Sequence, residues 1–443
     1  IRDSIDGGDQ SSDVPGVLMA EGSVLDGFTI RSVGVYDDAV WKQHHRTQGE
    51  LLGDDEGAVQ AKGKPPAISI RGVSCDVVNN LVHHNGNVGI AVLGDSQTRK
   101  NILVAGNITY RNLGGGIGIA GADDVVVRDN SCFENLRAGI GCRDASPLIL
   151  GNRCFRNIRA GIGCREGAKP IIRANVCYQN RRAGIGIRTA GTAPIVENNE
   201  CFENDMAGIG SRDEAQPIIN RNQCDRNRMA GIGADASAPL ISNNACRENA
   251  MAGIGISGGA SAVIHNNRCH ANKLVAVGVT QGSTAKIIGN ELSRTGGAPP
   301  IIAIRDGSRA TISENEIKGG GVAAVLVDGT AVISDNRFIG VGSKQGNAAW
   351  VWANSTAEIS SNAFVGYRTA IRASKADVSI SRNRVRHFQK TAIIVKDSMR
   401  PAHVFGNTAF SSDPDDQAAT IDGSAGIVGD NEVRSAAVGE AER

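Results

Sequence analysis

The 443-residue sequence is poor in aromatic side chains, since Phe, Tyr and Trp together make up 4% of it. It contains no run of about eighteen apolar residues, so it predicts no membrane-spanning helix. Neither sign of charge dominates: 47 Lys and Arg stand against 46 Asp and Glu, which argues against a dedicated nucleic-acid-binding protein. No signal peptide is visible at Ile1, and the polar, irregular opening would fit a leader removed before it.

The sequence has instead a repeated phrase, Asn-x-Cys-x-x-Asn-x-x-Ala-Gly-Ile-Gly, between Asn130 and Asn272. The copies run from NSCFENLRAGIG to NACRENAMAGIG, followed by a decayed copy, NRCHANKLVAVG. Its cysteines recur every 22 to 24 residues, at Cys132, Cys154, Cys177, Cys201, Cys224, Cys246 and Cys269. Such a period is typical of stacked supersecondary units that contact mainly their neighbours, and not of the disulfide framework of a small secreted domain.

Within one period, apolar residues come in short bursts, and none is long enough or periodic enough for a helix. This pattern predicts an all-β fold, a right-handed parallel β-helix with three short strands per coil. We expect roughly nineteen coils, spaced about 4.8 Å apart. A leucine-rich-repeat horseshoe is the competitor, but its Leu-rich signature is missing.

Polar sequence after the first strand-like unit breaks the rhythm. We predict four segments: a lead-in coil at 1–33, a polar insertion at 34–66, the β-helix at 67–433 and a tail at 434–443. The insertion contains Trp41, His44, His45 and an acidic run that begins at Asp54. It is either a functional loop on one face or a cap over the end of the stack.

The repeats resemble the parallel β-helix repeats of many secreted proteins, including the family named for the copper-site maturation protein NosD, and those of certain F-box proteins. The resemblance lies in the shape Pro-x-Ile-x-x-Asn-x-Ile-x-x-Asn-x-x-x-Gly-Ile and covers about 67–433. It implies the β-helix fold, and we expect an exported protein, periplasmic or extracellular. It leaves the function open, because β-helices include lyases, epimerases, hydrolases, binding proteins and scaffolds.

Stacked coils place equivalent residues in columns. The Cys column should face inward, because other coils have Ile, Leu or Phe there, and the Asn columns should bond to one another at the bends. One hypothesis is that four inward thiols bind a metal ion, since thiolates are suitable ligands for Cu(I) or zinc. These thiols are Cys132, Cys142, Cys154 and Cys164. The competing interpretation is neutral thiols that pack as small apolar groups. Parallel Cβ vectors disfavour disulfides between coils.

The Ala-Gly-Ile-Gly segment is the more unusual feature. If Ala and Ile point inward, both glycines point outward, at a cost of about 0.5–1 kcal/mol each relative to Ala. This pattern predicts a binding face where a ligand or another backbone approaches closely. The face comprises Gly139, Gly141, Gly161, Gly163, Gly184, Gly186, Gly208, Gly210, Gly231, Gly233, Arg143, Arg165, Arg188, Arg212, Trp350 and Trp352.

This face would accept an extended polymer such as a polysaccharide, a partner protein, or the same face of a second subunit. The alternative is that small residues merely suit a crowded strand. A further column follows the cysteines, at Phe133, Phe155, Tyr178 and Phe202. These rings would stack on sugars or, as we expect, on one another.

The leading functional prediction is a non-catalytic binding or scaffold protein. The alternatives are a polysaccharide lyase or epimerase and a copper-handling protein similar to the NosD family; no cofactor is predicted, and copper or calcium would be the candidates. A hydrolase needs two carboxylates at a defined separation, and the DPHD motif of the alginate epimerases is absent. An active site would break the repeat, as 34–66 does near His83 and His84. Adjacent strand histidines should point to opposite faces.

Overall fold

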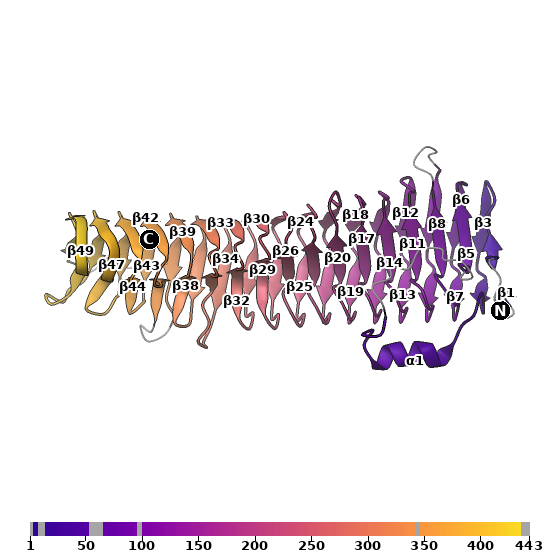
Figure 1. Cartoon of the computed structure of the whole chain (residues 1–443), viewed down its shortest axis with the longest axis horizontal. Coiled ribbons are helices and arrows are strands. Elements are labelled where there is room, and N and C mark those ends of the chain that lie inside the picture. The colour runs from indigo at the N-terminus through magenta and orange to yellow at the C-terminus, as the bar shows by residue number, and fades with distance from the viewer. Residues whose placement is uncertain (1–2, 8–13, 53–64, 95–99, 342–345, 436–443) are drawn as a thin grey trace. The chain divides into compact units, whose positions relative to one another are not determined.

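The computed structural model describes residues 3–7, 14–52, 65–94, 100–341 and 346–435. Over these residues the chain is an all-β solenoid of about 17 turns built from parallel strands, with one short helix (Figure 1). The predicted fold is therefore confirmed, with slightly fewer turns than expected. The chain divides into two compact units: unit 1 comprises Ile1–Gly233 and Ser237–Leu240, and unit 2 comprises Ala234–Ala236 and Ile241–Arg443.

In unit 1, each turn contributes one strand to each of three parallel ladders. The first ladder contains β1 (Ser4–Asp6), β4 (Thr29–Arg31), β7 (Leu81–His83), β10 (Ile108–Tyr110), β13 (Ser131–Phe133), β16 (Arg153–Phe155), β19 (Val176–Tyr178), β22 (Glu200–Phe202) and β25 (Gln223–Asp225). The second contains β2 (Val17–Leu18), β5 (Ile68–Arg71), β8 (Ile90–Leu93), β11 (Ile117–Ala120), β14 (Ile140–Arg143), β17 (Ile162–Arg165), β20 (Ile185–Arg188) and β23 (Ile209–Arg212).

The third ladder of unit 1 contains β3 (Ser23–Asp26), β6 (Cys75–Val78), β9 (Ile102–Ala105), β12 (Val125–Arg128), β15 (Leu148–Leu150), β18 (Ile171–Arg173), β21 (Ile195–Glu197) and β24 (Ile218–Asn220). Two strands lie at the boundary between the units, β26 (Ile232–Asp235) and β27 (Leu240–Ser242). β4 pairs with β7, and β3 pairs with β6, so the strands before the insertion belong to the same solenoid as the strands after it.

Unit 2 repeats the arrangement. Its first ladder contains β28 (Ala245–Arg247), β31 (Arg268–His270), β34 (Glu291–Arg294), β37 (Glu316–Gly319), β40 (Arg337–Ile339), β43 (Ala363–Val365), β46 (Arg384–Arg386), β48 (Thr408–Phe410) and β50 (Glu432–Arg434). Its second contains β29 (Ala252–Ser257), β32 (Val275–Val279), β35 (Ile302–Ile304), β38 (Ala323–Val327), β41 (Asn347–Val351) and β44 (Thr369–Ser374).

The third ladder of unit 2 contains β30 (Ser261–His265), β33 (Thr284–Ile288), β36 (Arg309–Ser313), β39 (Thr330–Ser334), β42 (Thr356–Ser360) and β45 (Asp377–Ser381). In the last turns, one long strand serves both the second and the third ladder, as β47 (Thr391–Phe405) and β49 (Gln417–Gly429) do. The predicted C-terminal tail lies almost wholly outside the described residues.

Asparagine side chains hold the bends of each turn in register, as expected from the sequence. In unit 1, Oδ1 of Asn152 accepts hydrogen bonds from the backbone N (3.0 Å) and Nδ2 (2.9 Å) of Asn130. Nδ2 of Asn152 in turn donates to Oδ1 of Asn175 (3.0 Å) and to the carbonyl of Val127 (2.9 Å). The amides are buried, and they form hydrogen bonds with backbone N–H and C=O groups at the bends, which strand pairing leaves without partners.

The helix α1 (Asp38–Arg46) arises from the insertion and packs against the side of unit 1 (Figure 1). Asp37 caps it by accepting hydrogen bonds from the backbone N of Ala39 (2.7 Å) and Val40 (3.3 Å). Trp41 is its buried residue and packs with Leu136 and Ile158, which follow β13 and β16. The helix therefore lies beside the turns rather than over an end of the stack. The acidic run from Asp54 lies outside the described residues.

Replacing one asparagine of the ladder should be costly. Asn175→Ala removes the Oδ1 atom that accepts hydrogen bonds from the backbone N and Nδ2 of Asn152. It also removes the Nδ2 atom that donates to the carbonyl of Ile149 (2.9 Å). We expect the free energy of unfolding to fall by about 3 kcal/mol, because buried polar groups lose their partners. Urea unfolding followed by circular dichroism measures the change, with the exposed Gln216→Ala as control. Equal stability of the two variants would contradict a structural role for the amides.

Candidate binding face

Four neighbouring strands of unit 1, β14, β17, β20 and β23, carry the Ile-Gly part of the repeat in exact register. Gly141 pairs with Gly163, Gly163 with Gly186, and Gly186 with Gly210. The isoleucine that begins each strand is buried, so the glycine after it faces outward by the alternation of a strand. The second glycine of each repeat therefore forms a continuous outward column.

The first glycine of each repeat does not face outward. The prediction of two outward glycine columns is therefore wrong for the first glycines and holds only for the second. A Cβ placed on Gly161 would lie 2.7 Å from the carbonyl oxygen of Gly184, 2.9 Å from Nδ2 of Asn180 and 3.2 Å from Cβ of Cys154. The same crowding surrounds its equivalents, and Gly231 is also buried. These glycines lie in the bend before the strand, where the asparagine ladder leaves no room for a side chain: Gly139, Gly161, Gly184 and Gly208.

The second glycines have space around them. A Cβ on Gly163 would lie 3.7 Å from Cβ of Ala138, and one on Gly141 would be 4.0 Å from its nearest atom, the carbonyl oxygen of Ile117. Both are ordinary contact distances, so no packing demand explains the missing side chains. The outward glycine column comprises Gly141, Gly163, Gly186, Gly210 and Gly233.

Arginines border the glycine column on both sides. Arg143, Arg165, Arg188 and Arg212 follow the glycines by two residues and share their outward direction. Glu166 pairs with both Arg143 and Arg165, and Nε of Arg212 lies 3.3 Å from Asp213. Burial lowers the pKa of Arg165 from its ordinary value. The opposite border contains Arg137, Arg159 and Arg182, and the acids Asp144, Glu166 and Asp213 directly follow arginines of the first border.

The insertion reaches this face. Nη2 of Arg159 donates a hydrogen bond of 3.0 Å to the carbonyl of Leu52, shortly after α1. Leu52 also packs against the cluster around Trp41. The segment that breaks the repeat therefore contacts one border of the glycine column.

The two tryptophans lie in unit 2: Trp350 faces outward on β41 of the second ladder, and Trp352 directly follows that strand. Trp350 of β41 pairs in register with Leu326 and Arg372, between buried Ala349 and Val351. Its ring is 5.8 Å from that of Trp352, at 75°. The Arg372 guanidinium lies 5.6 Å from the ring of Trp350, and that of Arg305 lies 5.9 Å from the ring of Trp352. The pair is an aromatic and cationic patch.

The structure does not gather Cys132, Cys142, Cys154 and Cys164 into one metal site, because they belong to two different ladders. Cys132 pairs with Cys154 on the first ladder, and Cys142 with Cys164 on the second. Within the described ranges, no three His, Cys, Asp or Glu side chains are placed to hold a metal ion.

The two thiols of the second ladder, Cys142 and Cys164, are buried neutral groups. Sγ of Cys142 donates to the carbonyl of Ala145 at 3.2 Å. Burial raises the pKa of Cys164 to about 12, and it also raises the pKa of Cys142 and Cys154. All of the cysteines are free and buried, so they pack as small apolar side chains.

The aromatic column of the first ladder stacks on itself, as expected. Consecutive ring centroids lie 4.8 to 5.1 Å apart with interplanar angles of 2° to 19°, in the order His83, Tyr110, Phe133, Phe155, Tyr178 and Phe202. Each inner ring has both faces covered by its neighbours. The column therefore stabilises the ladder and leaves only ring edges for a ligand.

The helix α1 docks next to this column through a cluster that sequence reasoning found only in part. The indole N–H of Trp41 donates to the carbonyl of Glu134 (2.9 Å), and the Arg111 guanidinium lies 4.5 Å from the Trp41 ring. Nε of Arg111 pairs with Oε2 of Glu134 at 2.9 Å, and the His45 ring stacks on Trp41 at 3.8 Å. Arg111 and Glu134 occupy bend positions that nothing in the repeat marks as functional.

His83 and His84 do not point to opposite faces, contrary to the expectation for adjacent strand residues. Their Nδ1 atoms lie 2.7 Å apart, because His84 follows the end of β7 and adopts a left-handed φ of 54°. The Tyr36 ring packs edge-on against His84 at 4.9 Å. Burial lowers the pKa of His45 and His83 to about 4 and also lowers that of His44 and His84. All four histidines are therefore neutral near pH 7.

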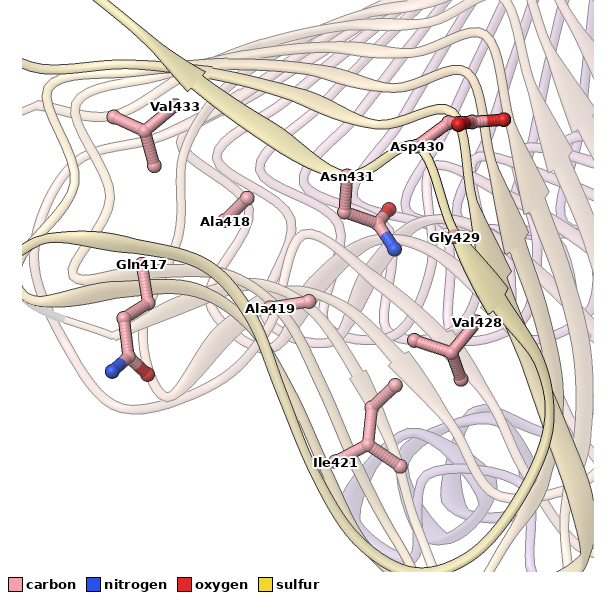
Figure 2. A pocket seen from close by; sticks show the side chains of 9 residues that line it. All are labelled: Gln417, Ala418, Ala419, Ile421, Val428, Gly429, Asp430, Asn431 and Val433. Atoms are coloured by element: carbon pink, nitrogen blue, oxygen red, sulfur yellow. The ribbon is translucent and has the colours of Figure 1, made fainter.

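A hollow of about 570 Å³ lies at the last turn of unit 2 (Figure 2). Its lining includes Ala419, Ile421, Val428 and Val433. Ala419 and Ile421 pair in register with Ile393 and Val395, which are buried in the preceding turn. The hollow thus lies at the end of the last described turn, where Val428 and Val433 are exposed and Asp430 and Asn431 also belong to the lining.

Comparison with known families finds two matching family models. The model of the right-handed β-helix region matches residues 62–193 and 234–364. The model of the periplasmic copper-binding protein NosD matches residues 155–297. Among curated proteins, none matches the chain. Within the part of the chain that the structure describes, no helix is long and apolar enough to cross a membrane.

Several solved structures are similar at low identity. The periplasmic alginate epimerase AlgG is 12% identical over 80% of this chain and 85% of its own, with a TM-score of 0.42. The A-module of the Azotobacter vinelandii mannuronan C-5 epimerase AlgE6 is 13% identical over 70% and 91%, with a TM-score of 0.44. The catalytic unit of a Streptomyces thermodiastaticus GH87 α-1,3-glucanase is 13% identical over 68% and 62%, with a TM-score of 0.41. At this identity their activities do not transfer to this chain.

The two glycine columns should respond differently to a methyl group. Gly161→Ala forces a Cβ against the Gly184 carbonyl and should lower the free energy of unfolding by about 2 kcal/mol or more. Gly163→Ala should leave it unchanged or raise it by about 0.5–1 kcal/mol, because the unfolded chain loses freedom. Thermal unfolding of the two variants checks this. Equal destabilisation would contradict the assignment of inward and outward glycines.

Docking of α1 should weaken in acid. His45 is neutral when docked, with its pKa lowered to about 4, and its neighbours include Glu134, Arg111 and Arg181. An undocked histidine titrates near 6.5, so the docked state has its full stability above about pH 6.5 and loses it as the pH falls toward 4. In a Trp350→Phe/Trp352→Phe background, Trp41 fluorescence should shift to the red over this range.

His45→Gln in that background is the control for this transition. It removes one titrating group, so the fluorescence change should become smaller. A spectrum that stays constant to pH 4, or an identical transition in the His45→Gln variant, would show that His45 does not control docking.

Proposed function

The chain belongs to the right-handed β-helix family, and we propose that it is a non-catalytic binding protein that holds an extended anionic polysaccharide along the outward glycine column of unit 1. The observation that carries this proposal is the register of Gly141, Gly163, Gly186 and Gly210 beside an equally regular column of arginines. A regular column fits a regular polymer better than a single small molecule.

The glycines provide close approach to the backbone. Packing does not require them, since a Cβ there meets only ordinary contacts. Glycine in a strand weakens it by about 0.5–1 kcal/mol relative to Ala. A ligand that lies flat against the strands would account for a series of such positions.

The arginines supply the recognition of negative charge. A guanidinium presents a planar set of donors that matches a carboxylate in two parallel hydrogen bonds. Because Glu166 pairs with Arg143 and Arg165, a uronate carboxylate would compete with Glu166 for these donors. Exposed ion pairs contribute only about 0.2–1 kcal/mol each, so affinity would come from many contacts and would fall with salt.

The arrangement favours binding over catalysis. The arginine and acid positions recur from turn to turn, whereas a catalytic centre is a single constellation. His83 contacts His84 and His45 stacks on Trp41, and neither pair contains an acid and a base beside the glycine column. The NosD match supports an exported location, which we also propose. A copper-handling role has less support, because the four thiols are buried and divided between two ladders.

Titration with oligouronates tests the proposal. Calorimetry with alginate or polygalacturonate oligomers should give binding that weakens with salt, and a neutral glucan of equal length should bind at least about tenfold more weakly. Gly163→Leu/Gly186→Leu should abolish binding with the fold intact. Arg188→Gln/Arg212→Gln should weaken it about tenfold, which corresponds to roughly 1.4 kcal/mol.

Arg337→Gln, an exposed arginine of unit 2 paired with Glu316, is the matched control and should bind normally. Unchanged binding by the double leucine variant would rule out the glycine column as the site. Equal affinity for neutral and anionic oligomers would rule out recognition by arginine.

A further inference from the structure

The outer face of the third ladder of unit 1 carries an unbroken column of branched aliphatic side chains. They lie on consecutive strands in register: Leu103, Val126, Leu148, Ile171, Ile195 and Ile218. Their strand neighbours, such as Ile172 and Val196, are fully buried, so the column faces outward. Ile171, Ile195 and Ile218 are exposed by 38%, 38% and 42%. Six turns at about 4.8 Å give a strip about 24 Å long.

The fold does not demand apolar residues here. In unit 2, the equivalent positions of the third ladder mix apolar and polar residues: Val263, Lys286, Thr311, Val332, Glu358 and Ser379. Polar side chains are therefore compatible with this strand position. An exposed apolar strip on a parallel sheet is unfavourable in water, because such sheets are normally covered on both faces. The strip in unit 1 points to a partner that covers it.

The charged residues beside the strip, Arg173 and Glu197, have opposite signs, so this face can be complementary in charge to the same face of a second copy. Two positions along each strand lies a second outward column, with Arg173 on β18 next to Glu197 on β21. The two side chains pair within the chain. If a second copy packed face to face with its turns running in the opposite direction, a two-fold axis between β18 and β21 would place Arg173 opposite Glu197 of the partner subunit. The same axis would place Ile171 opposite Ile195 of the partner subunit, as an isologous contact requires.

We propose that this chain forms an antiparallel homodimer through the aliphatic column of unit 1, with Arg173 and Glu197 setting its direction. A polysaccharide is a poorer fit, since the column has no aromatic ring to stack on a sugar and Arg173 beside it is paired with Glu197. The glycine column is a poorer dimer interface than the sequence suggested, because a two-fold contact would bring its arginine borders against each other. The two faces lie on different ladders, so dimerisation and polysaccharide binding can fail independently.

Sedimentation equilibrium tests the dimer. The wild-type chain should show a monomer–dimer equilibrium with a dissociation constant on the order of micromolar, as suits a small interface. Ile171→Asp/Ile195→Asp should raise that constant at least about 100-fold, because it would bury four carboxylates in the interface. Val176→Asp, on the outer face of the first ladder, is the control and should leave it unchanged. A wild type that stays monomeric at about 100 μM, or a double variant that dimerises normally, overturns the proposal.

Charge exchange tests the direction. Arg173→Glu alone and Glu197→Arg alone should each weaken self-association, because like charges would face each other across the axis. An equal mixture of the two variants should restore a heterodimer, since each face would then meet opposite charge. Native mass spectrometry resolves homodimers from heterodimers, and circular dichroism checks the fold. A mixture that forms no more dimer than either variant alone overturns the antiparallel arrangement.

Discussion

The structure depends on hydrogen bonds that pass from one asparagine amide to the next at the bends. Each Oδ1 accepts two donors from the preceding turn, as Asn152 does from Asn130, and each Nδ2 donates onward. Strand pairing satisfies the backbone only between bends, so without these amides buried N–H and C=O groups would lack partners. The asparagine ladder therefore fixes the register between successive turns, and this register aligns the outward-facing side chains into columns.

That register converts one repeat into surfaces of different chemistry. In unit 1, the first ladder presents stacked aromatic rings, the second presents glycines between arginines, and the third presents branched aliphatic side chains. Each surface is uniform because each turn contributes the same type of residue at the same height. The rings use their faces on one another, so two surfaces remain for partners: one suited to anionic polymer and one suited to a second copy.

Much of the molecule could be predicted from the repeat. The β-helix, its three strands per turn, the inward cysteines and the stacking of Phe133 on Phe155 all follow from period and alternation. The errors arise where alternation stops. Gly161 lies before its strand begins and faces the asparagine ladder, while His84 lies after its strand ends and turns back toward His83. The contact of Trp41 with Arg111 and Glu134 joins segments far apart in sequence, which no local pattern reports.

The sequence by itself determined the fold and the composition of each column, because a residue type repeated once per turn must occupy one position in a register-locked stack. Only the tertiary structure decided which glycine of each pair faces solvent. The first glycine lies in a crowded bend and the second lies on the open face of the strand, and this depends on where the strand begins. It also decided that the four thiols of the metal hypothesis lie on two ladders, and that an exposed aliphatic strip has the pair Arg173 and Glu197 at its side. Proximity between turns, which sets these outcomes, is a property of the folded stack.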